Sequence, residues 1–127
     1  MAIAHITLAT RDVVRTSHFF ASALGWQVLN RPNNIAVAAA WLEIAPGQEL
    51  HLVQIPDFAP SPFEREYGRH IAIRYPGAGF SDLKDRLRRL GAEVVAPLRE
   101  TPFERFFFLN PDGYVFEVIT DDAEKEV

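Results

Sequence analysis

Short segments in which hydrophobic and polar residues alternate recur along the chain, and such alternation predicts β-strands. In the segment 69–75, Ile71 and Ile73 fall on one face of an extended chain, and His70 falls on the other. The segment 3–9 repeats this pattern. Other segments of strand-like composition lie at 26–29, 35–44, 49–55, 93–96, 105–109 and 114–119. The chain is therefore predicted to form several short strands.

Two segments have apolar residues at the spacing of an amphipathic helix. The first is expected to begin at Asp12, whose carboxylate can cap a helix N-terminus, and to end at Gly25. The second is expected to be capped by Ser81 and to end at Gly91. Glycine suits a helix end because it accepts a positive φ. The order of elements is thus strand, helix and three strands, and this order occurs twice.

The sequence contains an internal repeat of two copies. His5 and His70 occupy equivalent positions in the first strand of each copy, and they are 65 residues apart. Gly47 lies in the turn before the strand predicted at 49–55, and Gly113 lies in the turn before the strand predicted at 114–119. Aligning these two glycines gives an offset of 66 residues, at which His51 and Glu117 occupy equivalent positions. An internal repeat constrains the fold strongly. Two copies predict two modules that close on each other.

We therefore predict an α+β fold, in which two βαβββ modules form a curved mixed sheet around one cavity. The predicted single domain spans 1–127, with module one at 1–56 and module two at 69–120. The segment 57–68 contains several prolines and has no clear period, so we interpret it as a linker or lid. The segment 121–127 is expected to be a frayed tail.

Alternation of side chains along a strand places one set of residues on the predicted cavity face. This set is His5, Thr7, His51, Val53, His70, Ala72, Arg74, Val115 and Glu117. The opposite face is apolar and is expected to pack under the helices. It comprises Ile6, Leu8, Leu50, Leu52, Ile71, Ile73, Phe116 and Val118.

Three imidazoles and one carboxylate share the predicted cavity face. A single histidine is more often structural than a metal ligand, but His5, His51, His70 and Glu117 occupy two pairs of repeat-equivalent positions. Such a donor set suits a divalent ion of Zn, Fe, Ni or Mn. Two histidines and a carboxylate also form the set used by non-haem Fe(II) oxygenases. The sequence therefore predicts a metal site without identifying the metal.

Composition narrows the class of protein only slightly. Hydrophobic residues make up 48% of the chain and charged residues 24%, as in an ordinary soluble protein. A net charge of −4 gives no reason to expect nucleic acid or an anionic membrane as a partner. The chain has no cysteine, which excludes disulfides and thiol chemistry. We expect a cytoplasmic protein.

Four segments, at 4–8, 24–26, 68–72 and 110–117, resemble those of the vicinal oxygen chelate superfamily. Its members include glyoxalase I, methylmalonyl-CoA epimerase, fosfomycin-resistance thiol transferases, extradiol dioxygenases and bleomycin-binding proteins. The most specific feature is a Pro-Asp-Gly turn with Glu117 four residues after the glycine. The resemblance covers essentially the whole chain.

The resemblance implies that strands one, five and eight supply the metal ligands, here His5, His70 and Glu117. Glyoxalase and epimerase members add a ligand from strand four, where His51 stands. Glyoxalase I commonly has a glutamate there, so Glu49 could take the place of His51. We also expect Glu117 and His51 to act in catalysis.

Five further residues are candidates for substrate binding. Arg74 could bind a substrate carboxylate bidentately or reach solvent, and the sequence favours neither. Thr7 lies on the predicted cavity face. Phe107 could form an apolar pocket wall, and Tyr67 and Arg105 could lie at the mouth of the pocket.

The resemblance implies a metal-dependent, glyoxalase- or epimerase-like lyase or isomerase acting on a small oxygen-chelating substrate. Extradiol dioxygenases usually add a His and a Tyr, but no His follows His70, and Phe107 stands about where the Tyr is expected. Fosfomycin thiol transferases use that Tyr and a later Arg, and no Arg follows Arg105. Bleomycin binders generally lack the metal ligands.

Two alternatives to the lyase or isomerase stay open, namely an extradiol-type dioxygenase and a non-enzymatic protein that sequesters an antibiotic or toxin. We also expect a homodimer, because small modules leave sheet edges to cover and the family is usually dimeric. The metal site could then lie within one chain or be shared between two chains.

Overall fold

The computed structural model describes residues 1–32, 34 and 36–121. The chain divides into two compact units, which we call unit 1 (Met1–Phe58) and unit 2 (Ala59–Val127). Residue 33, the first residue of the strand predicted at 35–44 and residues 122–127 of the predicted tail lie outside the described residues.

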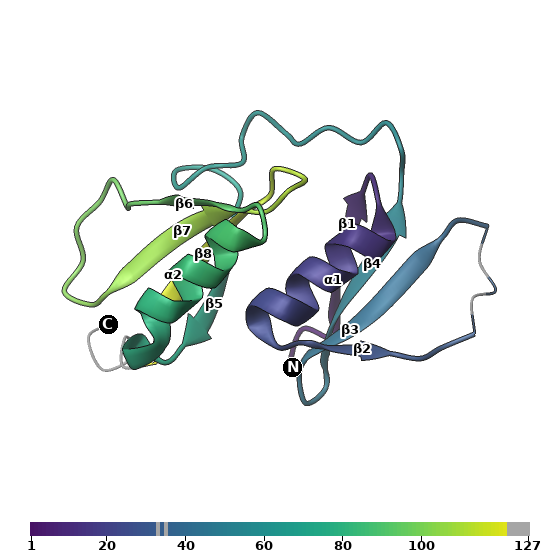
Figure 1. Cartoon of the computed structure of the whole chain (residues 1–127), viewed down its shortest axis with the longest axis horizontal. Coiled ribbons are helices and arrows are strands. Elements are labelled where there is room, and N and C mark those ends of the chain that lie inside the picture. Colours follow the sequence, from purple (N-terminus) through teal and green to yellow (C-terminus); the bar gives the residue numbers. More distant parts are fainter. Residues whose placement is uncertain (33, 35, 122–127) are drawn as a thin grey trace. The chain divides into compact units, whose positions relative to one another are not determined.

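Unit 1 is a four-stranded sheet with one helix against one face (Figure 1). Its elements are β1 (His5–Thr10), α1 (Val13–Leu24), β2 (Gln27–Leu29), β3 (Ala39–Ala45) and β4 (Gln48–Gln54). The strand order is β1-β4-β3-β2. β1 runs parallel to β4, and the other pairs are antiparallel.

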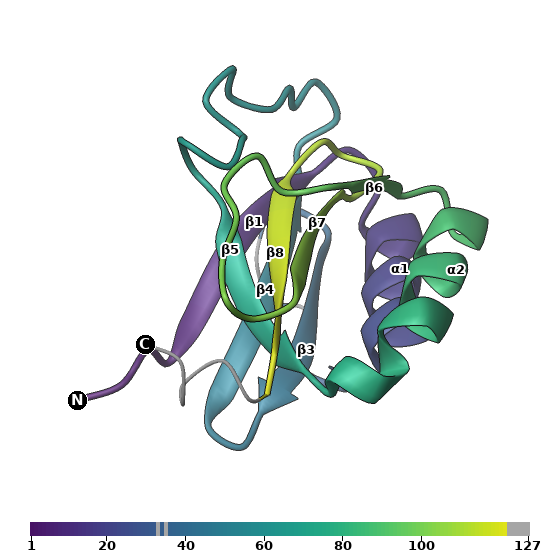
Figure 2. The ribbon, with the colours of Figure 1, turned by 90° about the vertical axis from the view of Figure 1, so that its left-hand side faces the viewer.

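Unit 2 repeats this topology. Its elements are β5 (Ile71–Tyr75), a 3-10 turn (Gly77–Gly79), α2 (Phe80–Arg89), β6 (Glu93–Val95), β7 (Arg105–Leu109) and β8 (Val115–Thr120). The order is β5-β8-β7-β6, with β5 parallel to β8, and α2 lies along one face of this sheet (Figure 2). The repeat in the sequence is thus a repeat of structure, and the predicted α+β, two-module architecture is confirmed.

The core of each unit lies between its sheet and its helix. In unit 1, Phe20 and Leu42 have no exposed surface, and Leu50 and Leu52 are 1% exposed. In unit 2 the corresponding fully buried side chains include Leu83, Leu87, Phe108 and Val118. The apolar strand positions expected under the helices are buried or half-buried. The remaining face of each sheet is therefore the one available to carry a site.

Both ends of α1 agree with the prediction from the sequence, but the N-terminus of α2 does not. Asp12 is the N-cap of α1, and its carboxylate accepts a hydrogen bond from the amide of the third residue along. Gly25 ends α1 with φ 73°, which only glycine adopts without strain. The prediction that Ser81 caps α2 is wrong. The 3-10 turn at 77–79 runs directly into the helix, so α2 begins at Phe80 and Ser81 lies inside its first turn.

Several strands begin later than predicted. The largest differences are at β3, which begins at Ala39 rather than at residue 35, and at β1 and β5, which begin at His5 and Ile71 rather than at residues 3 and 69. The late start of β5 has a clear cause, because Arg69 forms an isolated bridge with Glu64 instead of extending the strand. His70 therefore lies in the residue before the strand. Neither helix in the described part of the chain is long and apolar enough to cross a membrane.

Candidate functional site

The predicted ligands of unit 1 form a pair. β1 and β4 run in parallel register, with His5 beside Glu49 and Thr7 beside His51. The rings of His5 and His51 stack, with 3.9 Å between their centroids and 11° between their planes. Both imidazoles therefore lie on the same face of the sheet.

Glu49 is bound on the same face by an arginine that sequence reasoning had not identified. Arg31 donates from Nη1 to Glu49 Oε1 and from Nη2 to Oε2, each at 2.6 Å. His51 Nε2 lies 2.9 Å from Glu49 Oε1. The hydrogen bonds from Arg31 and then His51 lower the pKa of Glu49 to about 2. Glu49 is thus ionised and engaged, and the Nδ1 of His51 remains available to another ligand.

The predicted ligands of unit 2 form a second pair. His70 Nε2 lies 3.2 Å from Glu117 Oε1, and His70 Nδ1 lies 3.3 Å from the carbonyl oxygen of Arg65. A carbonyl oxygen only accepts hydrogen bonds, so Nδ1 carries the proton in that contact. In a neutral ring, Nε2 then presents a lone pair to a carboxylate oxygen. Such a contact between two acceptors is favourable only when a proton or another cation lies between them.

Arg105 is the principal partner of Glu117. Its Nη1 donates to Glu117 Oε2 at 3.0 Å, and its Nη2 donates to Glu66 Oε2 at 2.9 Å. The side chain of Arg105 is only 3% exposed, so it is buried within unit 2, and its predicted place at the mouth of a substrate pocket stays a prediction. Burial alone would lower the pKa of Arg105, but its hydrogen bonds to the two carboxylates raise it further than burial lowers it. The guanidinium therefore fixes one oxygen of Glu117.

Glu66 was not identified from the sequence as a site residue. Its Oε1 accepts from the amide of Leu98 at 2.7 Å, and its Oε2 accepts from the amide of Arg99 at 3.0 Å. Burial alone would raise the pKa of Glu66, but the two amides and Arg105 together lower it. The carboxylates of Glu66 and Glu117, both buried, thus share the one guanidinium of Arg105. This group has one negative charge in excess, which favours a cation beside it.

Glu64 attaches the same segment of chain to unit 2. Its Oε1 accepts from the amide of Val115 at 3.1 Å, and its Oε2 accepts from Arg69 Nη1 at 2.8 Å. We call residues 61–69 the anchoring segment, because Glu64 and Glu66 tie it to β8 and to the loop after β6. The segment predicted as a linker or lid is therefore held to unit 2 over most of its length.

We expect Glu66→Gln to reduce the acid sensitivity of unit 2. Because the pKa of Glu66 is lower in the folded protein than in the unfolded chain, its contribution to stability is complete above the unfolded value of about 4.3. That contribution is lost as the pH falls through the lower folded value. The free energy of unfolding, measured against pH below about 5, should fall less steeply in the variant. The exposed Glu93→Gln is the matched control, and an unchanged slope in Glu66→Gln would contradict the prediction.

A small cavity lies beside the His70–Glu117 pair. It has a volume of about 200 Å³ and is lined by Glu64, Arg65, Glu66, Val95, Ala96, Leu98, Phe107, Leu109 and Val115. Phe107 also meets the ring of His70 edge to face, with 5.4 Å between centroids. This cavity, which we call the apolar cavity, is bounded by the same phenyl ring that packs against a predicted ligand.

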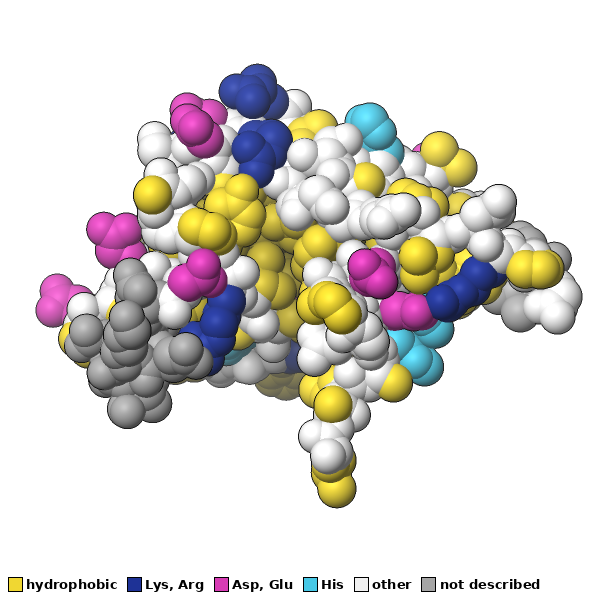
Figure 3. All heavy atoms as spheres, turned by 90° about the horizontal axis from the view of Figure 1, so that it is seen from below, with side chains coloured by type: hydrophobic (Ala, Val, Ile, Leu, Met, Phe, Trp, Pro, Cys, Tyr) yellow, Lys and Arg dark blue, Asp and Glu magenta, His cyan; other side chains and the backbone are white. Residues whose placement is uncertain are grey.

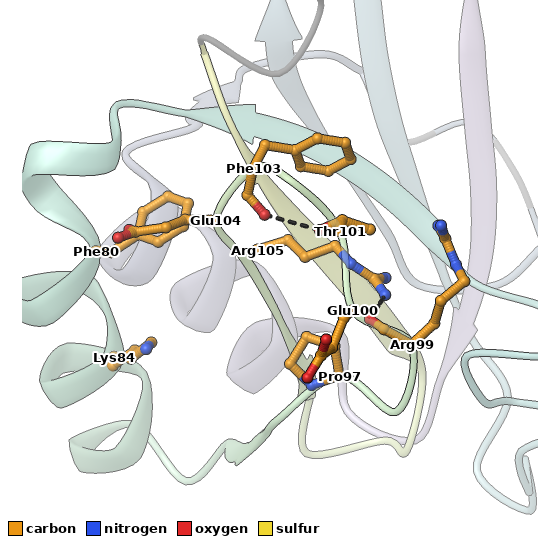
Figure 4. Close-up of a pocket in the computed structure, with 9 residues that line it drawn as sticks. All are labelled: Phe80, Lys84, Pro97, Arg99, Glu100, Thr101, Phe103, Glu104 and Arg105. Atoms are coloured by element: carbon orange, nitrogen blue, oxygen red, sulfur yellow. Dashed lines mark hydrogen bonds between the residues drawn. The ribbon is translucent and has the colours of Figure 1, made fainter. Parts of the chain in front are cut away.

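A larger cavity of about 410 Å³ lies between α2 and the loop before β7 (Figure 4). Lys84, Glu100 and Glu104 line it, so it combines charges of both signs. Arg105 also borders it, and its guanidinium turns away toward the carbonyl of Arg99. This cavity contains none of the predicted metal ligands, so size alone does not locate the site.

Three other predicted residues have exposed side chains. Thr7 and Arg74 are exposed on β1 and β5, and Tyr67 is 64% exposed in the anchoring segment. On the face seen in Figure 3, acidic and basic side chains are interspersed with hydrophobic ones. Among the described residues, no single cluster of three or more His, Asp or Glu could hold a metal ion. The predicted ligands occur instead as two pairs, one in each unit.

The fold is shared with solved fosfomycin resistance proteins. FosX from Mesorhizobium loti is 20% identical with a TM-score of 0.76, and the match covers 98% of this chain and 94% of that one. A point variant of FosX from Listeria monocytogenes, complexed with Mn(II) and 1S,2S-dihydroxypropylphosphonic acid, is 20% identical with a TM-score of 0.81, over 99% and 96%. At this identity the likeness establishes the fold alone.

A third match is a glyoxylase/bleomycin resistance protein/dioxygenase domain from Frankia sp. EAN1pec, with 20% identity and a TM-score of 0.74 over 94% of this chain and 97% of that one. The sequence model of the Glyoxalase/Bleomycin resistance protein/Dioxygenase superfamily matches residues 2–118. The chain therefore belongs to this superfamily, the vicinal oxygen chelate superfamily that its repeat and its Pro-Asp-Gly turn had predicted.

Proposed function

We propose that this protein is a metal-dependent lyase or isomerase that acts on a small oxygen-chelating substrate. The observation that carries the proposal is the contact between His70 Nε2 and Glu117 Oε1 at 3.2 Å, with Nδ1 engaged by a backbone carbonyl. Metal-binding histidines almost always donate their second ring N–H to a carbonyl or carboxylate in this way. A divalent cation would satisfy both facing acceptors.

The remaining predicted ligands are imidazoles, which the same divalent metals accept as donors. We propose His5 and His51 as the ligands from unit 1, and His70 and Glu117 as the ligands from unit 2. Two buried carboxylates share one guanidinium at Glu117, so the site carries the negative charge that a cation needs. One chain or two chains could supply the two pairs. The predicted homodimer and the predicted cytoplasmic location stay predictions.

We favour His51 over Glu49 as the fourth ligand. Both oxygens of Glu49 accept from Arg31, and breaking that bidentate pair would cost the protein two charge-assisted hydrogen bonds. Glu49 is instead placed to orient His51 through Nε2, as carboxylates commonly do for metal-binding histidines. In this role Glu49 is a positioning residue for the ring.

A bound divalent cation would polarise the chelating oxygens of the substrate and so favour loss of a neighbouring proton. We propose that His51 accepts that proton at Nδ1 when the substrate takes its place as a ligand, since three ligands suffice for an open site. The imidazolium formed would be stabilised by Glu49 through the contact at Nε2. Arg105 holds Glu117 in place throughout by its hydrogen bond to Oε2.

The relatives support the metal in this proposal and leave the reaction open. The solved FosX complex contains Mn(II) and a dihydroxypropylphosphonic acid, which is a small compound with several oxygens. An extradiol dioxygenase is less well supported, because the side chain packed against His70 is Phe107, which has no proton to transfer. Anaerobic reconstitution with Fe(II) and a panel of catechols would separate oxygenase from lyase chemistry.

We expect Glu117→Gln to lower the affinity for divalent metal by more than about 100-fold. Loss of an outer partner of a ligand typically costs 10- to 100-fold, and this change removes the charged ligand itself. Metal content after reconstitution with Fe, Mn, Ni and Zn separately, and calorimetric titration, provide the measurement. His18→Gln is the matched control, because His18 is exposed on α1 and contacts Ser22.

The same titration with His51→Gln tests whether His51 is the fourth ligand. We expect this variant to lose less metal affinity than Glu117→Gln does. If the wild-type protein binds none of the four metals better than Glu117→Gln does, the proposed enzyme fails. A protein that sequesters a small toxic molecule without a metal would then be the better interpretation.

A further inference from the structure

The apolar cavity lies on the same sheet face as the metal-binding pair of unit 2. Val95 pairs with Phe107 across β6 and β7, and Phe107 pairs with Glu117 across β7 and β8. Val115 stands two residues before Glu117 on β8, so it projects from the same face. Phe107 is the shared wall, since it lines the cavity and packs against the ring of His70.

The polar groups in the wall are already engaged. Glu64 and Glu66 line the cavity, but both oxygens of each carboxylate accept hydrogen bonds from neighbouring amides or guanidinium groups. The guanidinium of Arg65 lies over the ring of Phe63, 5.6 Å from its centroid. A polar group of a ligand placed here would lose its hydrogen bonds to water. It would gain none from Glu64 or Glu66 in return, because their oxygens already accept hydrogen bonds from the protein. The rest of the lining is hydrophobic, from Val95, Ala96, Leu98, Phe107, Leu109 and Val115.

The volume sets the size of the group that fits. In another protein, a dry engineered cavity of about 150 Å³ lined by aliphatic and aromatic side chains binds benzene. The apolar cavity, at about 200 Å³, is somewhat larger and similarly lined. A phenyl ring or a branched alkyl group would therefore fill most of it, whereas a methyl group would leave most of it empty.

We infer that the substrate carries a phenyl-sized or branched alkyl group next to its chelating oxygens, and that the apolar cavity binds this group. The inference rests on the proposed function, because the metal site fixes where the chelating oxygens lie. Val95 and Ala96 then determine how large a group is accepted, since both line the cavity from β6 and the residue that follows it.

The test compares two bidentate oxygen chelators that differ only in the group they carry, acetohydroxamate with a methyl and benzohydroxamate with a phenyl. We expect Mn(II)-loaded wild type to bind benzohydroxamate about 10- to 100-fold more tightly, as burial of one aromatic ring typically provides. Val95→Phe should abolish this preference while acetohydroxamate binding persists. Val28→Phe is the matched control, because Val28 is 50% exposed on β2 of unit 1.

Two further measurements make each outcome informative. Ala96→Phe repeats the filling at an exposed position of the lining, in case Val95→Phe does not fold. Metal uptake without any chelator, followed by electron paramagnetic resonance for Mn(II) and by metal analysis for Fe, Ni and Zn, tests the proposed function by itself. Equal affinities for the two hydroxamates in a protein that holds a bound metal would overturn the inferred substrate class and leave the proposed function intact. A protein that takes up none of the four metals would overturn the proposed function and, with it, this substrate class.

Discussion

Arg105→Met should destabilise unit 2 by about 3–5 kcal/mol, because it leaves two carboxylates buried without their shared cation. The side chains of Arg105, Glu66 and Glu117 are 3%, 9% and 10% exposed, so water cannot replace the lost ion pairs. Methionine is similar in length, which keeps loss of packing small. The free energy of unfolding by urea, followed by far-UV circular dichroism, gives the magnitude.

A surface arginine provides the matched control for this change. Arg88 pairs with Asp85 at 3.5 Å, with side chains 57% and 62% exposed, so Arg88→Met should change stability by less than about 0.5 kcal/mol. Adding Glu66→Gln to Arg105→Met should recover part of the loss, because one unpaired charge is removed. A loss in Arg105→Met no larger than in Arg88→Met would show that the buried network contributes little.

Phe108→Ala, tested by itself, should lower the free energy of unfolding of unit 2 by about 3–5 kcal/mol. Phe108 has no exposed surface and stacks on Phe116, with 5.2 Å between centroids and 5° between planes. The truncation therefore removes a buried ring and leaves a void that its neighbours cannot fully close. Phe63→Ala makes the same change at a side chain that is 60% exposed, and it should cost far less.

The location of the tryptophans allows the destabilisation caused by Phe108→Ala to be assigned to one unit. The only two, Trp26 and Trp41, are both in unit 1, so their fluorescence reports on that unit. Amide hydrogen exchange in β7 and β8 reports on unit 2. We expect Phe108→Ala to raise the exchange rates in β7 and β8. Protection in these strands as strong as in Phe63→Ala would contradict the assignment of Phe108 to the core.

The arrangement of strands could be predicted because it depends on local pattern and on the repeat. Period-two alternation placed Leu50 and Leu52 under a helix and left His51 on the other face, and β4 has this arrangement. The repeat predicted that His51 and Glu117 occupy equivalent strands, and each lies in the strand that pairs in parallel with the first strand of its unit. This pairing, which the sequence did not predict, brings His5 to His51 and His70 to Glu117.

The charged network around these pairs could not be predicted in the same way. Glu66 lies in a segment without a period, and its partners Leu98 and Arg105 are distant in sequence. Arg105 begins a strand of consecutive aromatic residues, so its sequence context gave no sign of a buried ion pair. Arg31 likewise follows a strand end and meets Glu49 only through the fold. Such contacts depend on tertiary proximity, which a one-dimensional pattern does not carry.

The anchoring segment has a consequence for how this chain could be divided or rearranged. The boundary between the units falls after Phe58, whereas Glu64 and Glu66 hold residues 61–69 to unit 2. A chain break between Phe58 and Ala59 would leave these carboxylates with the unit they stabilise, but a break at Tyr67 would separate them from Arg69 and His70. Circular permutants and two-fragment versions of the protein should therefore begin their second module ahead of the anchoring segment rather than at β5.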